Sequence, residues 1–309
     1  MPQGRLIRAA CAAALLALPA AAPAQPFSAE LGLGRQSLSA PLVRIDERSP
    51  VLRIDGLQRL SGTYLAASLS GLHDLPFAGG VLALSARADG RHAPVARDLG
   101  FAAANADAIV RWPLPGVTLG AGVGLQRLWV AGRPFRRAAP LQAEATLSTP
   151  GDDGHLALFA SHARQRHPGD FADFDGVASA ATLQRRWARP MTGLSAIELE
   201  VGVGRERNDA GHADLSEHHR HLRAAVSTAL AGVEFTLGHV WQRARFDAPL
   251  LDGLPARRDR LHGWDLAAAA ELTAGLTLRL EVQRLRNAAN LALFDSREQG
   301  WALTLAAQR

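Results

Sequence analysis

The chain has 309 residues, and its 34 basic side chains, all arginine, face 29 acidic ones, for a formal net charge of +5. Without Arg5 and Arg8, which fall in an expected leader, 32 basic residues remain against 29 acidic ones, so the charge does not indicate nucleic-acid binding. The single cysteine, Cys11, lies in the same leader, which excludes disulfides and cysteine metal sites from the rest of the chain.

Residues 1–24 are predicted to be a secretory signal peptide. Arg5 and Arg8 flank the start of an apolar run that ends near Leu18, and Ala22-Pro23-Ala24 has the small-x-small pattern of a cleavage site. No later segment has the roughly 20 uninterrupted apolar residues of a transmembrane helix. The remainder contains no segment with the composition of a linker, so one domain, residues 25–309, is expected.

From residue 28 onward, apolar residues alternate with small or polar ones, which is the period of β-strands. In the segment 141–148, Leu141 and Leu147 share the apolar face and Gln142 and Glu144 share the polar face. The pattern predicts fourteen strands, with twelve or sixteen as alternatives. The expected strands are 28–36, 60–71, 79–89, 97–108, 116–131, 138–149, 155–165, 176–187, 193–206, 218–230, 232–246, 259–272, 275–287 and 296–308.

Short and long connections alternate along the chain. Tight turns are expected at 150–154, 188–192, 230–232 and 273–275, and long polar loops at 37–59, 166–175, 207–217, 247–258 and 288–295. Outer-membrane barrels have short periplasmic turns and long external loops, whereas a β-sandwich has no reason to sort its loops in this way. The predicted fold is therefore all-β, an antiparallel up-and-down transmembrane β-barrel in the outer membrane of a Gram-negative bacterium.

The tryptophans agree with this orientation, because their rings favour the two membrane interfaces. With both ends of the barrel domain in the periplasm, four of them fall near the outer ends of their strands and two near the inner ends. The outer group is Trp129, Trp241, Trp264 and Trp301, and the inner group is Trp112 and Trp187.

The lumen face is expected to carry more acidic residues than arginines. The candidate lumen residues are Glu144, Glu198, Glu200, Arg223, Glu234, Asp265, Glu271, Arg279 and Glu281, together with Glu30, Arg87 and Asp98. Either these acids favour cations or a polar solute in an open lumen, or they pair with lumen arginines or a plugging segment, because a buried acid without a partner is costly.

Two groups of arginines, Arg133, Arg136 and Arg137, and Arg257, Arg258 and Arg260, are expected in loops. They could contact lipopolysaccharide or a protein partner, or simply be solvated.

No motif points to a metal, a cofactor or catalysis. His219 and His221 would share one side of a strand and could reach one ion, but a hydrated loop end explains them as well. The acidic run from Asp170 to Asp175 lacks the glycine and glutamate of a calcium loop. There is no G-x-S-x-G motif and no placeable Ser, His and acid set, so an enzyme is not indicated.

The last strand is expected to present the signal that the barrel assembly machinery recognises, a polar-x-Gly-x-x-apolar-x-apolar pattern. Gly300, Trp301, Leu303 and Leu305 fit this pattern, with Gly300 toward the lumen and the other three toward lipid. The terminal aromatic residue that commonly ends such a signal is missing, which bears on assembly efficiency rather than on the fold.

The last fifty residues, from about 258, resemble the final strands of the barrel domain of the surface lipoprotein assembly modifiers. The resemblance rests on an Arg-Asn-x-x-Asn loop and a following Phe-Asp-Ser-Arg segment, which supply Arg286, Asn287, Asn290, Asp295 and Arg297. Ala289, Phe294 and Ser296 depart from the family pattern, and the family's periplasmic tetratricopeptide repeats have no counterpart here.

The resemblance implies an outer-membrane protein that helps to export lipoproteins or related proteins to the cell surface, with a co-encoded lipoprotein as its client. The alternative from a different class is a small porin-like diffusion channel, or a passive structural barrel, with an acidic lumen. Membrane lipid and lipopolysaccharide are expected partners in both cases.

Overall fold

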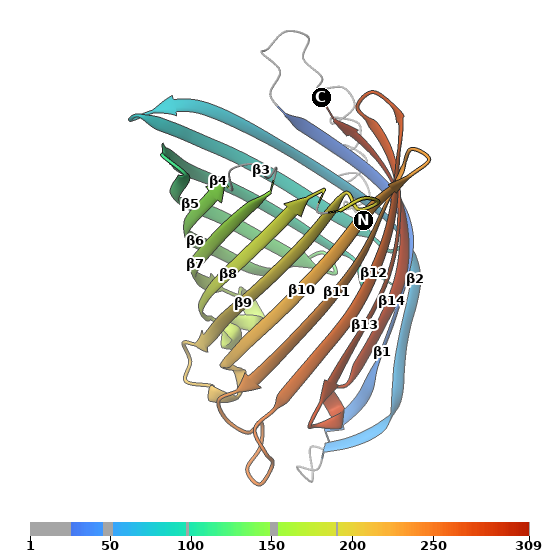
Figure 1. Ribbon diagram of the computed structural model, residues 1–309. Helices are drawn as coiled ribbons and strands as arrows, with labels where there is room; N and C mark the ends of the chain where they lie inside the picture. The colour runs from blue at the N-terminus through green and yellow to red at the C-terminus, as the bar shows by residue number, and fades with distance from the viewer. Residues whose placement is uncertain (1–25, 46–51, 97–98, 149–153, 190, 309) are drawn as a thin grey trace.

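The computed structural model describes residues 26–45, 52–96, 99–148, 154–189 and 191–308. The expected signal peptide and Asp98 lie outside these ranges. The described residues form one closed antiparallel barrel in which each strand pairs with the next along the chain and the first pairs with the last (Figure 1). The strands are inclined strongly to the barrel axis (Figure 1), as closure of a sheet requires.

The barrel has fourteen strands, which confirms the number expected from the period-two pattern. They are β1 (Phe27–Ile45), β2 (Leu52–Phe77), β3 (Gly80–His92), β4 (Phe101–Leu114), β5 (Val117–Val130), β6 (Arg133–Ser148), β7 (His155–Arg166), β8 (Gly176–Ala188), β9 (Ala196–Asn208), β10 (Glu217–Leu230), β11 (Val233–Phe246), β12 (Arg258–Thr273), β13 (Leu276–Ala289) and β14 (Ser296–Gln308).

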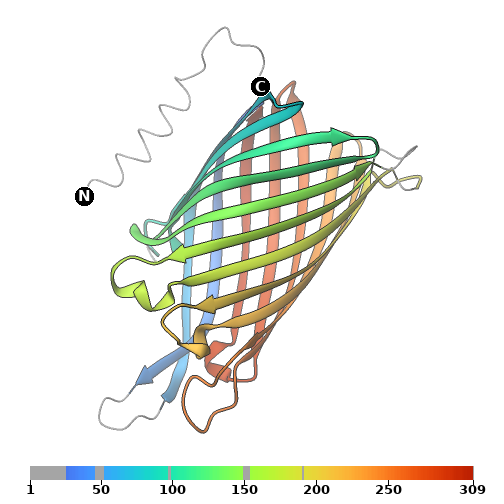
Figure 2. The same cartoon turned by 90° about the vertical axis from the view of Figure 1, so that its left-hand side faces the viewer.

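The connections that precede β8, β10 and β14 contain short 3-10 helices, η2 (Gly169–Phe174), η3 (Ala213–Leu215) and η4 (Ala292–Phe294). They gather at one end of the barrel, which we call the loop end, while the C-terminal end of β14 lies at the opposite, turn end (Figure 2). Within the described ranges, no helix has the length and apolar character needed to cross a membrane. Because short turns face the periplasm in outer-membrane barrels, the loop end is assigned to the outside.

The prediction of a long polar loop at 37–59 was wrong, because most of this segment belongs to strands. β1 continues to Ile45 and β2 begins at Leu52, so the two strands pair far beyond the expected ends, with an irregularity in register between Pro41 and Val43. This segment lacks the strict alternation of the membrane-facing strands because it extends past the barrel wall at the loop end, where neither face has to be apolar (Figure 2).

The prediction that Arg133, Arg136 and Arg137 lie in a loop was also wrong. Ala131 and Gly132 close a two-residue hairpin with positive φ angles of 49° and 78°, and Arg133, Arg136 and Arg137 belong to β6. Two positive φ angles give the turn whose twist matches paired strands.

One further group expected in a loop lies mostly in a strand. Arg258 and Arg260 belong to β12, so that of the second arginine group only Arg257 lies in a connection. His218 to His221 belong to β10, in agreement with the strand expected at 218–230. Polar composition at the end of a strand thus misled the prediction for both arginine groups.

An apolar belt surrounds the barrel. Leucines and valines of nearly every strand, among them Leu33, Leu125, Val203, Leu237 and Leu303, expose more than 40% of their surface. A monomeric protein in water does not expose apolar surface on this scale, and only a closed barrel pairs every backbone group of strands in hydrocarbon. The protein is therefore a membrane-spanning β-barrel of the outer-membrane type.

The six tryptophans all lie on the outward face, in two groups. Register places Trp129, Trp241, Trp264 and Trp301 toward the loop end and Trp112 and Trp187 near the turn end. The apolar belt lies between the two groups, as it does between the interfacial girdles of outer-membrane barrels.

Candidate functional site

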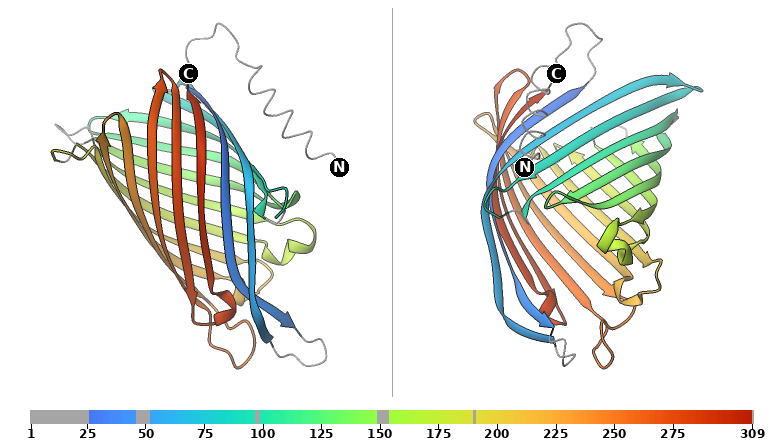
Figure 3. Two further views of the ribbon diagram at one scale, coloured as in Figure 1. Left: turned by 90° about the vertical axis from the view of Figure 1, so that its right-hand side faces the viewer. Right: turned by 180° about the vertical axis from the view of Figure 1, so that it is seen from behind.

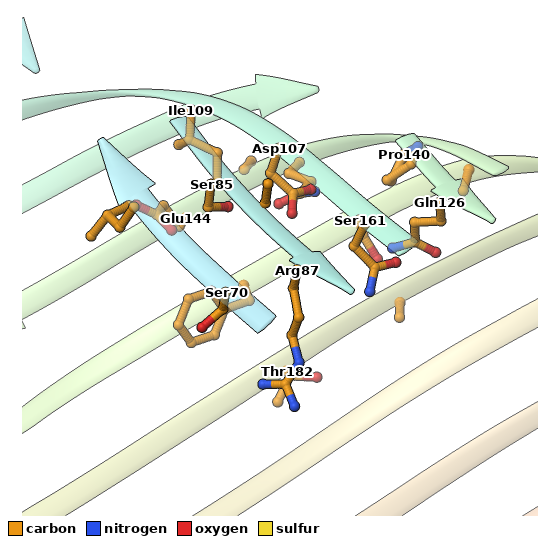
Figure 4. A pocket seen from close by; sticks show the side chains of 18 of the residues that line it. Ser70, Ser85, Arg87, Asp107, Ile109, Gln126, Pro140, Glu144, Ser161 and Thr182 are labelled. Atoms are coloured by element: carbon orange, nitrogen blue, oxygen red, sulfur yellow. The ribbon is translucent and has the colours of Figure 1, made fainter. Parts of the chain in front are cut away.

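The candidate site is the lumen of the barrel. Residues directly opposite each other in an antiparallel pair point to the same face, so the register divides every strand into lumen-facing and outward-facing residues. The lumen set includes Ser70, Gln126 and Thr182, which line an internal cavity of about 1070 Å³ (Figure 4). The outward set carries the apolar belt.

The structure places all nine candidate lumen residues on the lumen face. Glu144 lies on β6, Glu198 and Glu200 on β9, Arg223 on β10, Glu234 on β11, Asp265 and Glu271 on β12, and Arg279 and Glu281 on β13. Glu30 and Arg87 share this face. In the last strand, Gly300 faces the lumen and Trp301, Leu303 and Leu305 face outward.

The cavity occupies the side of the lumen formed by β1 to β8. Its lining is mostly neutral and polar, with serines from β1, β2, β3 and β7, and three charged side chains, Arg87, Asp107 and Glu144, point into it (Figure 4). A cavity of this volume is of the size that binds small molecules.

Strand β5 presents Gly120, Gly122 and Gly124 to the lumen, which lets side chains of its two neighbours meet above it. Arg111 of β4 forms an ion pair with Glu144 of β6 across Gly120, where an added Cβ would lie 2.4 Å from the Glu144 Cγ. In the same way, Gln142 Nε2 donates to Asp107 Oδ1 at 2.5 Å beside Gly124. Glu144 is therefore a paired acid, as the second interpretation of the lumen acids expects.

A polar chain crosses the seam between the last strand and the first, which lie side by side (Figure 3). Glu298 Oε1 accepts hydrogen bonds from Gln283 Nε2 at 3.0 Å and from Gln36 Nε2 at 2.7 Å. Gly300 lies opposite both glutamines and leaves room between them. Arg91 donates to Gln36 Oε1 and places its guanidinium 4.0 Å from the centre of the Tyr64 ring.

The connection between β3 and β4 folds against the lumen face. Ala93 and Leu99 are buried together with Tyr64, and lumen-facing Leu38, Leu60 and Ala302 pack against them. A Cβ on Gly62 would lie 3.1 Å from the Ala96 Cβ, so glycine makes room for this connection. The connection between β3 and β4 therefore narrows the lumen at the loop end, beside β1, β2 and β14.

The opposite wall, formed by β9 to β13, is highly charged. His219 pairs with Glu217 at 3.2 Å and His221 with Glu200 at 3.1 Å, and their rings lie over Gly204 and Gly202 of β9. Each histidine thus pairs with a different glutamate, and the two rings do not converge on a site for one metal ion. In the part of the chain that the structure describes, no group of three His, Cys, Asp or Glu residues could hold a metal.

Several acids of this wall have no partner. Arg186 pairs with Glu198 at 3.5 Å and Arg279 with Glu281, but Glu234, Asp265 and Glu271 make no ion pair or hydrogen bond with any described side chain. The lumen wall therefore combines paired acids with free ones.

Three of the residues that carry the family resemblance, Asn287, Asn290 and Asp295, form hydrogen bonds at the loop end of the barrel. Asn290 accepts from the Arg258 N–H at 2.6 Å and donates to the Ala256 carbonyl at 3.0 Å, which ties the connection after β13 to the one before β12. Asp295 accepts from the Ala289 N–H at 2.7 Å. Asn287 donates to the Phe294 carbonyl at 3.0 Å. Arg286 and Arg297 lie opposite each other on the outward face.

The connection between β7 and β8 encloses a histidine. The His167 side chain is 5% exposed and packs edge-on against Phe135, with ring centroids 5.3 Å apart. Burial lowers the pKa of His167 from its usual 6.5, although Asp175 opposes the shift. Burial acts to raise the pKa of Asp175, but the hydrogen bonds from Arg166 at 2.7 Å and from the His167 N–H at 2.5 Å outweigh it and lower that pKa.

Acidification is expected to loosen this connection. The pKa of His167 is lower in the folded connection than in an opened one, where the imidazole is exposed. Neutral His167 therefore stabilises the folded connection fully above pH 6.5. This stabilisation declines as the pH falls below 6.5, because the opened segment binds a proton more readily. The lowered pKa of Asp175 keeps its carboxylate charged in this range.

Hydrogen exchange of residues 167–175, corrected for intrinsic rates, should be faster at pH 5.5 than at pH 8. A His167→Phe variant retains a ring against Phe135 and should lose the pH dependence. An unchanged pH dependence in that variant would assign the effect to another group.

Comparisons with known proteins yield structural matches only. No family model and no curated protein matches the sequence. Among solved structures, OpdL of Pseudomonas aeruginosa aligns at 13% identity over 91% of this chain and 99% of its own, with a TM-score of 0.44. The toluene transporter TodX of Pseudomonas putida aligns at 9% identity over 96% and 93%, with a TM-score of 0.46.

A loop-deletion form of OmpT, an outer membrane protein of Vibrio cholerae, aligns at 6% identity over 92% and 99%, with a TM-score of 0.45. Identities and TM-scores this low indicate nothing about a solute or a client. The function has to come from the residues of this chain.

Proposed function

We propose that the barrel is a porin-like diffusion channel for small polar solutes, with a preference for cations. The observation that carries the proposal is the charge of the lumen face, where acids outnumber arginines. The lumen-facing acids of the described strands are Glu30, Asp74, Asp89, Asp107, Glu144, Glu198, Glu200, Glu206, Glu217, Glu234, Asp259, Asp265, Glu271, Glu281 and Glu298, and the arginines are Arg87, Arg91, Arg111, Arg136, Arg186, Arg223 and Arg279.

The free acids are the part of this set that acts on a permeating ion. A carboxylate paired with arginine contributes little net field, whereas Glu234, Asp265 and Glu271 face the lumen from β11 and β12 without a cationic partner. Rings and clusters of free carboxylates favour cations in pores. The polar cavity along β1 to β8 supports small solutes rather than a folded protein.

Planar bilayers test the proposal. The purified protein should conduct steadily and pass potassium in preference to chloride. In an E234Q/D265N/E271Q variant, the permeability ratio should fall by about twofold or more. A D173N/D214N/D252N variant removes the same charge outside the lumen and should keep the wild-type ratio. A barrel that does not conduct, or one that prefers anions, would contradict the proposal.

Export of lipoproteins is the alternative, and it rests on the likeness of the last fifty residues. Asn287, Asn290 and Asp295, which carry much of that likeness, are engaged in hydrogen bonds that hold the loop end together. Their presence therefore has a structural explanation that needs no client protein. For this reason we favour the channel.

A further inference from the structure

Arginines cover the outward face of the barrel near the loop end of β10, β11 and β12. Arg220, Arg243 and Arg260 form one cross-strand row, and Arg245 and Arg258 form a second row closer to the loops. We call these five residues the arginine face. Four of the side chains are exposed and Arg243, at the centre, is half-buried.

The rows bring like charges directly opposite each other. Arg220 is opposite Arg243, Arg243 is opposite Arg260, and Arg245 is opposite Arg258. Directly opposed residues have Cβ atoms about 4.5–5.5 Å apart, and like charges at that separation destabilise a sheet. Such rows are tolerated where an anion neutralises them.

The protein itself supplies no anion at the centre of this face. Asp247 pairs with Arg205 at 3.8 Å and His218 at 3.3 Å, beyond the edge of the rows. None of the five arginines forms an ion pair with a described acid. Moreover, Arg243 Nε is buried and has no hydrogen-bond partner among the described residues. A buried donor without an acceptor is costly, and this one lies at the centre of the two rows.

The height of the arginine face relates it to the membrane. Along β11 the outward residues run from the apolar Leu237 through Trp241 to Arg243, and along β12 they run from Leu266 through Trp264 to Arg260. Tryptophan rings lie at the level of the headgroups. The arginines begin one outward position beyond Trp241 on β11 and two beyond Trp264 on β12, and therefore lie at the phosphate layer of the outer leaflet.

We propose that the arginine face is a binding site for the phosphate groups of lipopolysaccharide in the leaflet that surrounds the barrel. Guanidinium groups bind phosphate bidentately, and a bisphosphorylated lipid presents two such groups at the height of the two rows. The acyl chains of the same lipid would cover the exposed Trp264 and Leu266 below. The site goes beyond the proposed channel activity, because it lies on the opposite face of the barrel wall.

Native mass spectrometry of the folded full-length barrel in detergent tests this site. The probe is bisphosphorylated lipid A, with dephosphorylated lipid A and inorganic phosphate as comparison ligands. Each arginine near an anionic surface contributes roughly fivefold in affinity, so an R220Q/R243Q/R260Q variant should bind the bisphosphorylated lipid roughly 100-fold more weakly. The corresponding triple lysine variant keeps the three charges but not the bidentate geometry, so its affinity should lie between those of the wild type and the glutamine variant.

The matched control is R87Q/R186Q/R279Q, which removes three charges from the lumen and should bind the lipid like the wild type. Heat-modifiable migration on gels shows whether each variant is folded. Measurements on the wild type alone also test the proposal. If dephosphorylated lipid A binds the wild type as tightly as the bisphosphorylated form does, the proposal is overturned. Competition by millimolar inorganic phosphate alone would show an ion site rather than a lipid site, and would overturn it as well.

Discussion

Leu303→Asp is expected to prevent the barrel from reaching its folded state in the outer membrane. Leu303 lies on the outward face of β14, 41% exposed, between Trp301 and Leu305, and pairs with Leu33 and Leu280 on the neighbouring strands. Asp at this position would place a carboxylate in hydrocarbon and remove one side chain of the assembly signal. The cost is on the order of 1–2 kcal/mol, so the folded, heat-modifiable protein should fall by about tenfold.

The matched control is Thr304→Asp on the same strand. Thr304 faces the lumen and lies opposite Arg279, so the new carboxylate would be hydrated beside an arginine. Its folded level should stay near that of the wild type. Equal levels of folded protein in both variants would contradict the assignment of the two faces of β14.

Gly122→Ala is expected to destabilise the barrel although it adds only one carbon. A Cβ at this lumen position of β5 would lie 2.4 Å from the Ala108 carbonyl oxygen and 2.8 Å from the Ile109 Cα. Both are backbone atoms of β4, so the strands themselves have to move apart. Overpacking of this kind costs about 1–3 kcal/mol. The midpoint of urea unfolding in lipid vesicles measures the effect.

Gly90→Ala on β3 provides the comparison, since nothing lies within 4 Å of a Cβ added there. Its stability should equal or exceed that of the wild type by up to about 1 kcal/mol, because alanine restricts the unfolded chain. Equal unfolding midpoints for the two variants would show that the close approach of β4 and β5 is not a constraint on Gly122.

The two faces of each strand could be predicted from sequence because they depend only on parity. Glu200 and Leu199 alternate whatever the partner strands are, and the apolar neighbour identifies the lipid side. Partners could not be predicted in this way. A shift of two residues in register keeps every face but replaces the neighbours, so the alternating pattern cannot tell that Arg111 meets Glu144 across a glycine.

Composition misled the prediction at strand ends. Arg133 to Arg137, and Arg258 with Arg260, look like loop sequence, yet both groups belong to strands whose ends lie outside the hydrocarbon, where polar residues carry no cost. The inward packing of Ala93 and Leu99 left no sequence signal, because their partners Tyr64 and Ala302 come from distant strands. For this packing, the sequence did not reveal which distant residues are neighbours.

The hydrogen bond from Gln36 to Glu298 joins residues that are 262 positions apart in the chain. Bringing the ends of so long a segment together costs about 5 kcal/mol in chain entropy, and none of it is recovered until β1 and β14 pair. Every partly folded state therefore exposes two unpaired strand edges, which are the parts of a sheet that aggregate. We therefore expect this protein to fold slowly, and its success to depend on protecting the edge of β1 until β14 pairs with it.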